Sequence, residues 1–469
     1  MSPPALTPNR RIAVRTLDGA PSAYDVFQAT HGQPQPFFLD SGLPIGGLGR
    51  HSFVGSGPFL TLTAKGRSGK VVTAAGEELF HGSPFRKLRD LLQAHRIPSG
   101  AKETPFVGGA VGYFGYDLCH HVERLPDTTI DDMGFPDLYL AFYDHAFTID
   151  HETGVCTLAA CDANGGDPEE IIEERLASLR GKLGRYDAAQ EQAHGADGVI
   201  ACNFTRDEYL RAVEQAKDYI AAGDIFQVNL SQRFHVDLAC SPRRLHNRLR
   251  TINPAPFAAY LEFGDCAVVS ASPERFLRVR GRRVETRPIK GTRRRTGDEE
   301  SDRRMREELL ASPKDNAELA MIVDLERNDL GRVCSYGTVR VTQKCVLEEH
   351  PTVYHLVATV EGDLHEGRDL VDLLKAAFPG GSITGAPKIR SMEIIDELEP
   401  TKRAVYTGAI GYLGFDGTMD LNIVIRTFLI QGRRAFFQVG GGIVADSEPE
   451  SEYDETLDKA KALIDAVRA

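Results

Sequence analysis

The stretch Ser272–Thr292 reads SPERFLRVRGRRVETRPIKGT, in which two runs of alternating apolar and charged residues flank Gly281. Alternation on both sides of a glycine is typical of a β-hairpin. A three-residue turn at Gly281-Arg282-Arg283 would set Glu274 opposite Lys290, about 5 Å apart at Cβ. An acid that faces an amine can act as a general acid beside a nucleophile. From this segment alone, however, an exposed cross-strand ion pair of little energetic value is the favoured interpretation.

Two further segments place acidic pairs at the first turn of a helix. Ser312-Pro313 is typical of a helix start, which sets Asp315 and Glu318 on one face. Ser451 and Asp454 resemble a capping pair before an amphipathic helix, and Glu452 and Glu455 lie three positions apart within it. The pairs could converge on a hard cation such as Mg²⁺, which prefers oxygen ligands. Alone, each pair is better explained as a complement to the helix dipole, worth about 0.3–1 kcal/mol.

Composition describes an ordinary globular chain and excludes some functions. The 469 residues are 42% hydrophobic and 26% charged, and the net charge is −12. An acidic balance argues against general binding of nucleic acid or membrane surfaces. The local arginine runs, 278–283 and 293–295, are better explained as a solvated face, although they could also attract an anionic substrate.

Cysteine usage and the N-terminus indicate the compartment. None of the eight cysteines forms a Cys-x-x-Cys motif, which argues against zinc ribbons and thioredoxin-like chemistry. No apolar run suggests a signal peptide or a membrane span. We therefore expect a cytoplasmic protein with reduced thiols.

Local patterns predict several elements. Residues 108–116 are rich in glycine and aromatic residues, which suits closely packed strands. Leu138–Ile149 is predicted as one strand, and Asp167–Leu183 as a helix with Pro168 in its first turn. Thr205 and Glu208 form a capping box for a helix that reaches about Ala222.

Several blocks along the second half of the chain carry a family resemblance. Pro288-Ile289-Lys290-Gly291-Thr292 resembles a motif of the chorismate-utilising enzymes, and specifically of their aminodeoxychorismate synthase component I branch. The anthranilate synthase branch has alanine where Lys290 stands. Four other blocks are similar to those of the family and follow in family order: residues 224–231 (DIFQVNLS), 324–332 (DLERNDLGR), 378–388 (FPGGSITGAPK) and 440–447 (GGGIVADS).

The resemblance implies an α+β fold with large antiparallel sheets packed with helices, as in anthranilate synthase component I. We divide the chain into an N-terminal region (1–183), a polar linker (184–198) and a chorismate-binding catalytic domain (199–469). The resemblance also implies that both regions share an extensive sheet system, so the two parts need not be separate in space.

Site residues follow from the same resemblance. It implies that Glu318 and Glu455 bind Mg²⁺ with Asp315 and Glu452 as acidic companions; Asp315, shorter than the glutamate of anthranilate synthases, suits an outer-sphere role. Arg426 lies in an apolar strand, where an unpaired guanidinium is costly, and a substrate carboxylate would satisfy it. A buried structural salt bridge is the alternative. The resemblance places Tyr406 with Arg426 on the enolpyruvyl carboxylate and Thr384 near the ring, and it matches His355 to the family's active-site histidine. For a lone histidine in an apolar segment, a satisfied core residue is the alternative. Gly440-Gly441-Gly442, after a strand over Ala435–Val439, would offer backbone donors.

The chemistry that the resemblance implies is amination of chorismate at C4. Lys290 attacks ring carbon 2, Glu274 protonates the leaving hydroxyl, and ammonia then displaces Lys290. An unprotonated lysine near pH 7 requires roughly 3.5–4.5 kcal/mol of destabilisation of its cation. None of the cysteines lies in a Gly-x-Cys-x-Gly elbow, so ammonia would come from a separate glutamine amidotransferase subunit.

Other functions remain as alternatives. Anthranilate synthase component I aminates carbon 2 and releases pyruvate, and isochorismate or salicylate synthases use a lysine as a base for water. A non-catalytic regulator that binds chorismate or an aromatic amino acid is the alternative from another class. Phe38-Leu39-Asp40-Ser41 resembles the edge of the tryptophan pocket in the family's N-terminal region, so tryptophan is a possible ligand there.

Overall fold

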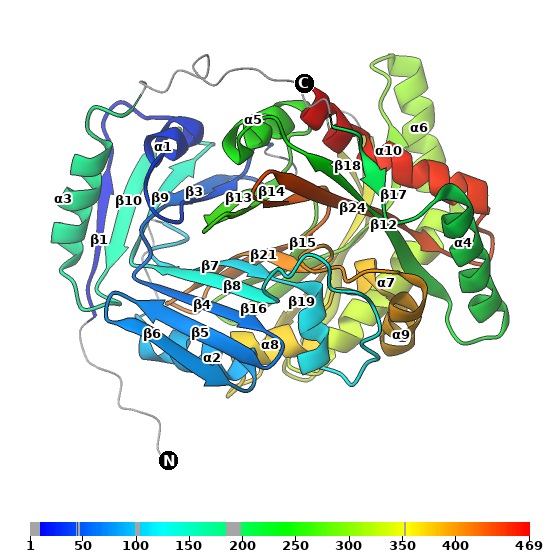
Figure 1. Ribbon diagram of the computed structural model, residues 1–469, viewed down its shortest axis with the longest axis horizontal. Coiled ribbons are helices and arrows are strands. Elements are labelled where there is room, and N and C mark those ends of the chain that lie inside the picture. The colour runs from blue at the N-terminus through cyan, green and yellow to red at the C-terminus, as the bar shows by residue number, and fades with distance from the viewer. Residues whose placement is uncertain (1–9, 44, 46, 99–103, 184–197, 351–352) are drawn as a thin grey trace.

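Two antiparallel sheets of twelve strands each form the centre of the molecule (Figure 1). The computed structural model describes residues 10–43, 45, 47–98, 104–183, 198–350 and 353–469. The first sheet has the order β1 (Ile12–Thr16), β10 (Cys156–Cys161), β9 (His145–Asp150), β3 (His51–Gly55), β2 (Phe37–Asp40), β13 (Phe257–Phe263), β14 (Cys266–Ser272), β23 (Thr427–Gln431), β24 (Arg434–Ile443), β12 (Gln227–Asp237) and β11 (Ala201–Cys202), with β20 (Gly385–Ala386) beside β12.

The second sheet has the order β17 (Ile289–Arg294), β19 (Val353–Asp363), β16 (Arg283–Arg287), β15 (Arg275–Arg280), β22 (Met419–Ile423), β21 (Ala409–Gly414), β7 (Gly109–Phe114), β8 (Leu138–Tyr143), β4 (Leu60–Lys65), β5 (Ser68–Thr73) and β6 (Gly76–His81), with β18 (Arg340–Glu349) beside β19. The helices are α1 (Ala23–Ala29), α2 (Pro84–Ala94), η1 (Tyr116–His121), α3 (Pro168–Leu179), α4 (Arg206–Ala221), α5 (Pro242–Ile252), α6 (Glu299–Ala311), α7 (Pro313–Gly331), α8 (Leu370–Ala377), η3 (Gly381–Ile383), α9 (Lys388–Leu398) and α10 (Pro449–Arg468).

The layers follow from which faces are apolar. An aromatic core that includes Phe37, Phe53, Tyr113 and Tyr143 fills the space between the two sheets. Helices α1, α3, α5 and α10 pack on the outer face of the first sheet, and α2, α7 and α8 on that of the second (Figure 1). Burial of apolar surface on both faces of both sheets is the main stabilising contribution. The predicted α+β class is confirmed.

Both sheets contain strands from both halves of the chain. Strand β2 pairs with β13 in the first sheet, and β7 pairs with β21 in the second. The N-terminal region and the region after residue 198 are therefore joined by backbone hydrogen bonds at two places. The predicted linker, apart from Gly198, lies outside the described residues.

Two predicted strand assignments need correction. The run from Leu138 to Ile149 is two strands, β8 and β9, and the chain passes from one sheet to the other at Asp144. Both strands are buried on both faces, so the apolar run gives no sign of the crossing. The glycines 440–442 do not follow a strand but lie within β24, where they pair with Ser231, Leu230 and Asn229 of β12.

The predicted hairpin exists as β15 and β16, but its register was wrong. Arg280 pairs with Arg283, so the turn has two residues, Gly281-Arg282, and a bulge follows between Arg275 and Arg278. Strand β16 ends at Arg287, because Pro288 has no N–H to donate to the ladder. The chain then continues as β17, in which Lys290 pairs with Leu356 of β19.

Helix starts were predicted with mixed success. The capping box of Thr205 and Glu208 begins α4, and the Ser312 hydroxyl accepts the Asp315 N–H at the start of α7, both as expected. Helix α3 has the expected start but ends at Leu179. Helix α10 begins at Pro449 rather than after Ser451, since proline at the first position is already set for the helix.

The close contact of β7 with its neighbours generates a stability prediction. A Cβ on Gly112 would overlap the carbonyl oxygen of Tyr139, whereas nothing lies within 4 Å of a Cβ on Gly331 at the end of α7. We expect Gly112→Ala to destabilise the protein by about 1–3 kcal/mol or more, because backbone must move. Gly331→Ala should be neutral or slightly stabilising. Denaturant unfolding measures both, and equal midpoints would contradict the packing of β7.

Candidate active site

Lys290 points into the interior between the end of the hairpin and the η3 segment. Its ammonium group donates a hydrogen bond of 3.3 Å to the carbonyl oxygen of Ser382. Burial lowers the pKa of this lysine, against the attraction of the Glu318 and Glu274 carboxyl groups. No ion pair within 4.0 Å holds this cation among the residues described. A lysine in this setting is suited to act as a nucleophile near neutral pH.

Glu274 lies between β14 and β15 and is buried, with 5% of its surface exposed. Its carboxyl oxygen accepts a hydrogen bond of 3.5 Å from the Ile289 N–H, next to Lys290. Burial raises the pKa of Glu274 to about 7, although the Ser382 hydroxyl and the Lys290 charge favour ionisation. The two groups therefore meet in one site through the strand after the hairpin, not through the predicted cross-strand pairing.

Three of the four predicted acids lie in one region between α7, which carries Glu318, and α10, which carries Glu452 and Glu455. The position that a Cβ on Gly441 would take is 3.1 Å from a Glu452 oxygen and 3.7 Å from a Glu455 oxygen. Burial raises the pKa of both Glu318 and Glu452, and the Glu455 charge adds to each increase. Burial also opposes ionisation of Glu455, but Lys459, 2.6 Å away, lowers its pKa.

Two of the predicted acids, Glu452 and Asp315, contact other side chains of the protein. Glu452 accepts a hydrogen bond of 2.6 Å from the Ser447 hydroxyl, and Asp315 pairs with Arg293 at 3.0 Å. Within the described ranges, no three acidic, histidine or cysteine side chains are close enough to chelate a metal as they stand. The donor set nevertheless fits a hard cation, because Glu318, Glu452 and Glu455 are oxygen donors whose charges repel one another, and the last two face Gly441.

Arg426 and His355 are close enough for the arginine charge to act on the imidazole ring. Arg426 has a positive φ of 52°, which is unusual for a residue with a side chain, and burial lowers its pKa. Among the described residues, no carboxylate forms an ion pair with it. His355 shares a hydrogen bond of 2.9 Å between its Nδ1 and the Thr292 hydroxyl, while its Nε2 is buried without a partner. Burial and the nearby Arg426 charge hold the His355 pKa well below its usual range, so the ring is neutral.

Thr384 and Tyr406 complete the predicted set. The Thr384 hydroxyl donates to the Gly380 carbonyl at 2.9 Å and is fully buried, and the Asn229 N–H donates to the Thr384 carbonyl at 2.8 Å. Tyr406 is buried, which raises the pKa of its phenol. The charges of Glu274, Glu318 and Glu455 act on Lys290 and oppose the decrease in its pKa. The charge of Arg426 acts on His355 and lowers its pKa further.

Sequence reasoning missed Gln227 and Lys459. Gln227 is buried at the start of β12 with its Oε1 unpartnered, and its amide occupies the space that a Cβ on Gly442 would need. The Lys459 ammonium donates to the Gly440 carbonyl at 2.9 Å. Polar residues at 227, 229 and 231, which alternate with Val228 and Leu230 at the start of the strand, could have identified Gln227.

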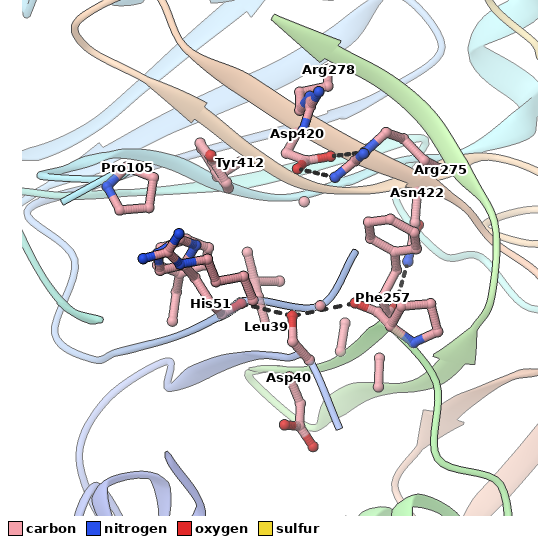
Figure 2. A pocket seen from close by; sticks show the side chains of 18 of the residues that line it. Leu39, Asp40, His51, Pro105, Phe257, Arg275, Arg278, Tyr412, Asp420 and Asn422 are labelled. Carbon is pink, nitrogen blue, oxygen red and sulfur yellow. Dashed lines mark hydrogen bonds and ion pairs between the residues drawn. The ribbon is translucent and has the colours of Figure 1, made fainter. Parts of the chain in front are cut away.

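A separate cavity, partly open to solvent, lies between the two sheets (Figure 2). Its wall includes Leu39, Asp40 and Ser41, the segment expected at the edge of a tryptophan pocket, and the ring of Phe257. Arg275, whose guanidinium is held by Asp420 at 3.0 Å, lines the same cavity. Arg275 directly follows Glu274 in the sequence.

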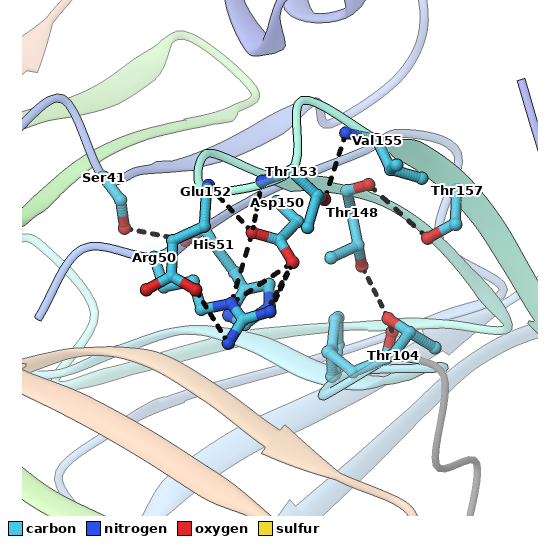
Figure 3. A network of polar contacts seen from close by, with 11 residues as sticks. Ser41, Arg50, His51, Thr104, Thr148, Asp150, Glu152, Thr153, Val155 and Thr157 are labelled. Carbon is cyan, nitrogen blue, oxygen red and sulfur yellow. Dashed lines mark hydrogen bonds and ion pairs between the residues drawn. The ribbon is translucent and has the colours of Figure 1, made fainter. Parts of the chain in front are cut away.

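A polar network closes one side of this cavity (Figure 3). Arg50 pairs with Asp150 at 2.7 Å and with Glu152 at 3.0 Å, and the Arg50 guanidinium holds the pKa of Asp150 well below its usual range. The Ser41 hydroxyl donates to the His51 carbonyl at 2.7 Å. The network fixes Ser41 and His51, two residues of the cavity wall.

Comparisons with known proteins identify the family and the fold. The family model for chorismate binding enzymes matches residues 50–465. Anthranilate synthase component 1 of Thermus thermophilus is 43% identical over 98% of both chains, and aminodeoxychorismate synthase component 1 of Bacillus subtilis is 41% identical over 88% of both. The crystal structure of anthranilate synthase component I from Streptococcus pneumoniae is similar with a TM-score of 0.80 at 32% identity, over 89% of this chain and 92% of that one. The expected fold is thereby confirmed.

None of the helices in the described part of the chain is long and apolar enough to cross a membrane. The family model covers the hairpin, both acidic helices and the glycine-rich strand that surround Lys290. On this evidence the chain belongs to the chorismate binding enzyme family.

Proposed function

We propose that the chain aminates chorismate at C4 with ammonia and gives 4-amino-4-deoxychorismate, the precursor of 4-aminobenzoate and hence of folate. The observation that carries the proposal is the proximity of a half-buried amine of lowered pKa, Lys290, to a buried carboxyl group of raised pKa, Glu274. Such a pair can supply a neutral nucleophile and a protonated acid together near pH 7. Relatives named aminodeoxychorismate synthase component 1, from Bacillus subtilis and Salmonella typhimurium, are 41% and 40% identical to this chain.

The proposed reaction has two displacements. In the first, the Lys290 amine forms a bond to ring carbon 2, the ring double bonds shift, and the C4–O bond breaks while Glu274 gives its proton to the departing hydroxyl. In the second, ammonia bonds to C4, the double bonds shift back, and Lys290 leaves as an amine while Glu274 regains a proton from the new ammonium. The enolpyruvyl arm takes no part and stays on the product.

The two carboxylates of chorismate need separate sites. Arg426, a half-buried cation without a described anionic partner, suits the enolpyruvyl carboxylate together with Tyr406 and the backbone of Gly440–Gly442. His355 and Thr384 would lie beside the ring. Glu318, Glu452 and Glu455 would hold Mg²⁺ at the ring carboxylate, with Asp315 behind them. When bound, magnesium would draw electron density toward that carboxylate and orient the ring.

The ammonia would come from a separate glutamine amidotransferase subunit, because none of the eight cysteines has the Gly-x-Cys-x-Gly setting of a triad glutaminase. The cavity between the sheets would accept tryptophan. The Phe257 ring offers an aromatic contact, and Arg and Asp side chains offer partners for the two charges of the amino acid.

One observation favours a second function. The Thermus thermophilus relative at 43% identity is named anthranilate synthase component 1. An enzyme of that kind would add ammonia at carbon 2 and release pyruvate. Lys290 distinguishes the two proposals, since a covalent lysine at carbon 2 would direct ammonia to C4.

Product identity tests this choice. With chorismate, Mg²⁺ and excess ammonium salt, we expect the chain to form a 4-amino product that retains the enolpyruvyl group, as resolved by chromatography with mass detection. Lys290→Ala should abolish that product because the nucleophile is lost, while Lys461→Ala, on the exposed side of α10, should leave the rate unchanged. Anthranilate and pyruvate from the unaltered chain, or full C4 amination by Lys290→Ala, would contradict the proposal.

The pH dependence of kcat/KM tests the roles of the pair. Glu274 acts as an acid, so activity should fall as the pH rises through its pKa of about 7. Lys290 must be neutral, so activity should also fall as the pH decreases through its lowered pKa. Glu274→Gln should reduce kcat by about 10²–10⁴-fold and remove the alkaline decline. An alkaline limb that is unchanged in Glu274→Gln would show that another group is the acid.

Calorimetric titration with Mg²⁺ tests the acidic cluster without relying on activity. Glu318→Gln and Glu455→Gln should each weaken Mg²⁺ binding at least about 10-fold, since each removes a charged oxygen ligand. Glu448→Gln is the matched control, because Glu448 directly precedes α10 and its side chain makes no cap hydrogen bond there. If all three variants bind Mg²⁺ like the unaltered chain, these acids serve the helix ends and not a metal.

A further inference from the structure

The buried residue Arg403 contacts three of the segments that build the active site. Only 2% of its surface is exposed, and its guanidinium carbon lies 4.9 Å from the ring centre of Tyr116 and 5.8 Å from that of Tyr406. Its charge is balanced by Glu399, which accepts hydrogen bonds of 2.9 Å from Nε and 2.6 Å from Nη2. The proposed reaction assigns no step to this ion pair.

The remaining guanidinium hydrogens reach the backbone around the site. Nη1 donates to the Ile383 carbonyl at 3.1 Å and to the Thr407 hydroxyl at 3.3 Å, and Nη2 donates to the Asn229 carbonyl at 2.6 Å. With the two bonds to Glu399, all five donors of the side chain are used. Few side chains other than arginine could make these contacts at once.

Each contact bears on a residue of the proposed chemistry. Ile383 stands between Ser382, whose carbonyl accepts the Lys290 ammonium, and Thr384. Asn229 donates its N–H to the Thr384 carbonyl, so β12 and the η3 segment are held together on both sides. Arg403 thus fixes the acceptor that orients the Lys290 amine.

The third contact fixes the segment of Tyr406. Ala404 and Thr407 have positive φ angles of 50° and 58°, a conformation that costs energy for residues with a side chain. The Thr407 hydroxyl, which accepts from Arg403, donates in turn to the Tyr406 carbonyl at 2.6 Å. A turn with two such residues persists only where its surroundings hold it.

We propose that Arg403 is a positioning residue. It holds Lys290 and Tyr406 at a fixed separation, so that both can act on the same substrate molecule. The inference rests on the proposed function for the roles of Lys290 and Tyr406. It goes beyond that function because Arg403 touches neither the substrate nor the reacting atoms. Its contribution is to hold the Ser382–Thr384 segment and the Ala404–Thr407 turn at a fixed separation.

Arg403→Lys tests the proposal, because lysine keeps the charge opposite Glu399 but cannot reach all the backbone acceptors. Arg243→Lys is the matched control. Arg243 is also buried, lies over the rings of Phe27 and Tyr260 at 4.3 and 5.6 Å, and is part of the helix-covered side of the first sheet. Both variants should lower the unfolding midpoint, so stability alone does not distinguish them.

Steady-state kinetics of chorismate consumption distinguish the two. We expect Arg403→Lys to lower kcat by about 10- to 100-fold, as for small displacements of reacting groups, and to raise KM for chorismate. Arg243→Lys should leave both constants unchanged below its melting range. In a double-mutant cycle with Tyr406→Phe, the fold loss in kcat/KM of the double variant should be smaller than the product of the two single losses.

Either of two results would overturn the proposal. The first is a kcat/KM of Arg403→Lys within two-fold of that of the unaltered chain. The second is a double variant with Tyr406→Phe whose loss in kcat/KM equals the product of the two single losses. If Arg403→Lys does not fold, the pair Arg403→Gln with Glu399→Gln removes both charges together and carries the same expectation. The assay follows loss of chorismate and not the position of the new amino group. Failure of the C4 assignment would therefore leave the result for Arg403 interpretable.

Discussion

Two half-buried cations without described carboxylate partners, Lys290 and Arg426, set the constraint on which the rest of the site depends. The ammonium of Lys290 contacts a single carbonyl oxygen, and Arg426 is desolvated opposite a neutral His355. Removing such charges from water is costly unless an anion replaces the lost hydration. A substrate carboxylate would supply that compensation for Arg426. Lys290 avoids the cost by losing its proton, because desolvation lowers its pKa and so keeps its amine available as a nucleophile.

The two stacked sheets make this burial possible. Residues before 183 and after 198 contribute strands to both sheets, so the aromatic core between them belongs to the whole chain. A polar layer lies within this apolar frame, in which Ser231, Gln438, Glu399 and Arg403 bond to one another beneath the proposed substrate site. Within this network Arg403 uses all five of its donors, and such contacts hold neighbouring backbone in one arrangement, which a displacement at a ring carbon requires.

Much of the local structure could be predicted from sequence because its causes are local. The caps at Thr205 and Ser312 and the close packing at Gly112 depend on residues within a few positions or on the absence of a side chain. The hairpin register could not be predicted, since it depends on turn length and on a bulge beyond Arg275. The crossing between sheets at Asp144 and the pairing of Asp315 with Arg293 depend on tertiary contacts. Family resemblance supplied the substrate residues, but neither Gln227 nor Arg403.

The central claim is that the half-buried Lys290 amine forms a bond to the substrate ring. Its most direct test is to incubate the chain with chorismate and Mg²⁺ in the absence of any ammonia source, quench in acid, and determine the mass of the peptide that contains Lys290. We expect this peptide to gain the mass of chorismate less one water, and Glu274→Gln to accumulate less of the adduct. A Lys290 peptide of unchanged mass, while chorismate is still converted once ammonia is added, would contradict a covalent role for this lysine.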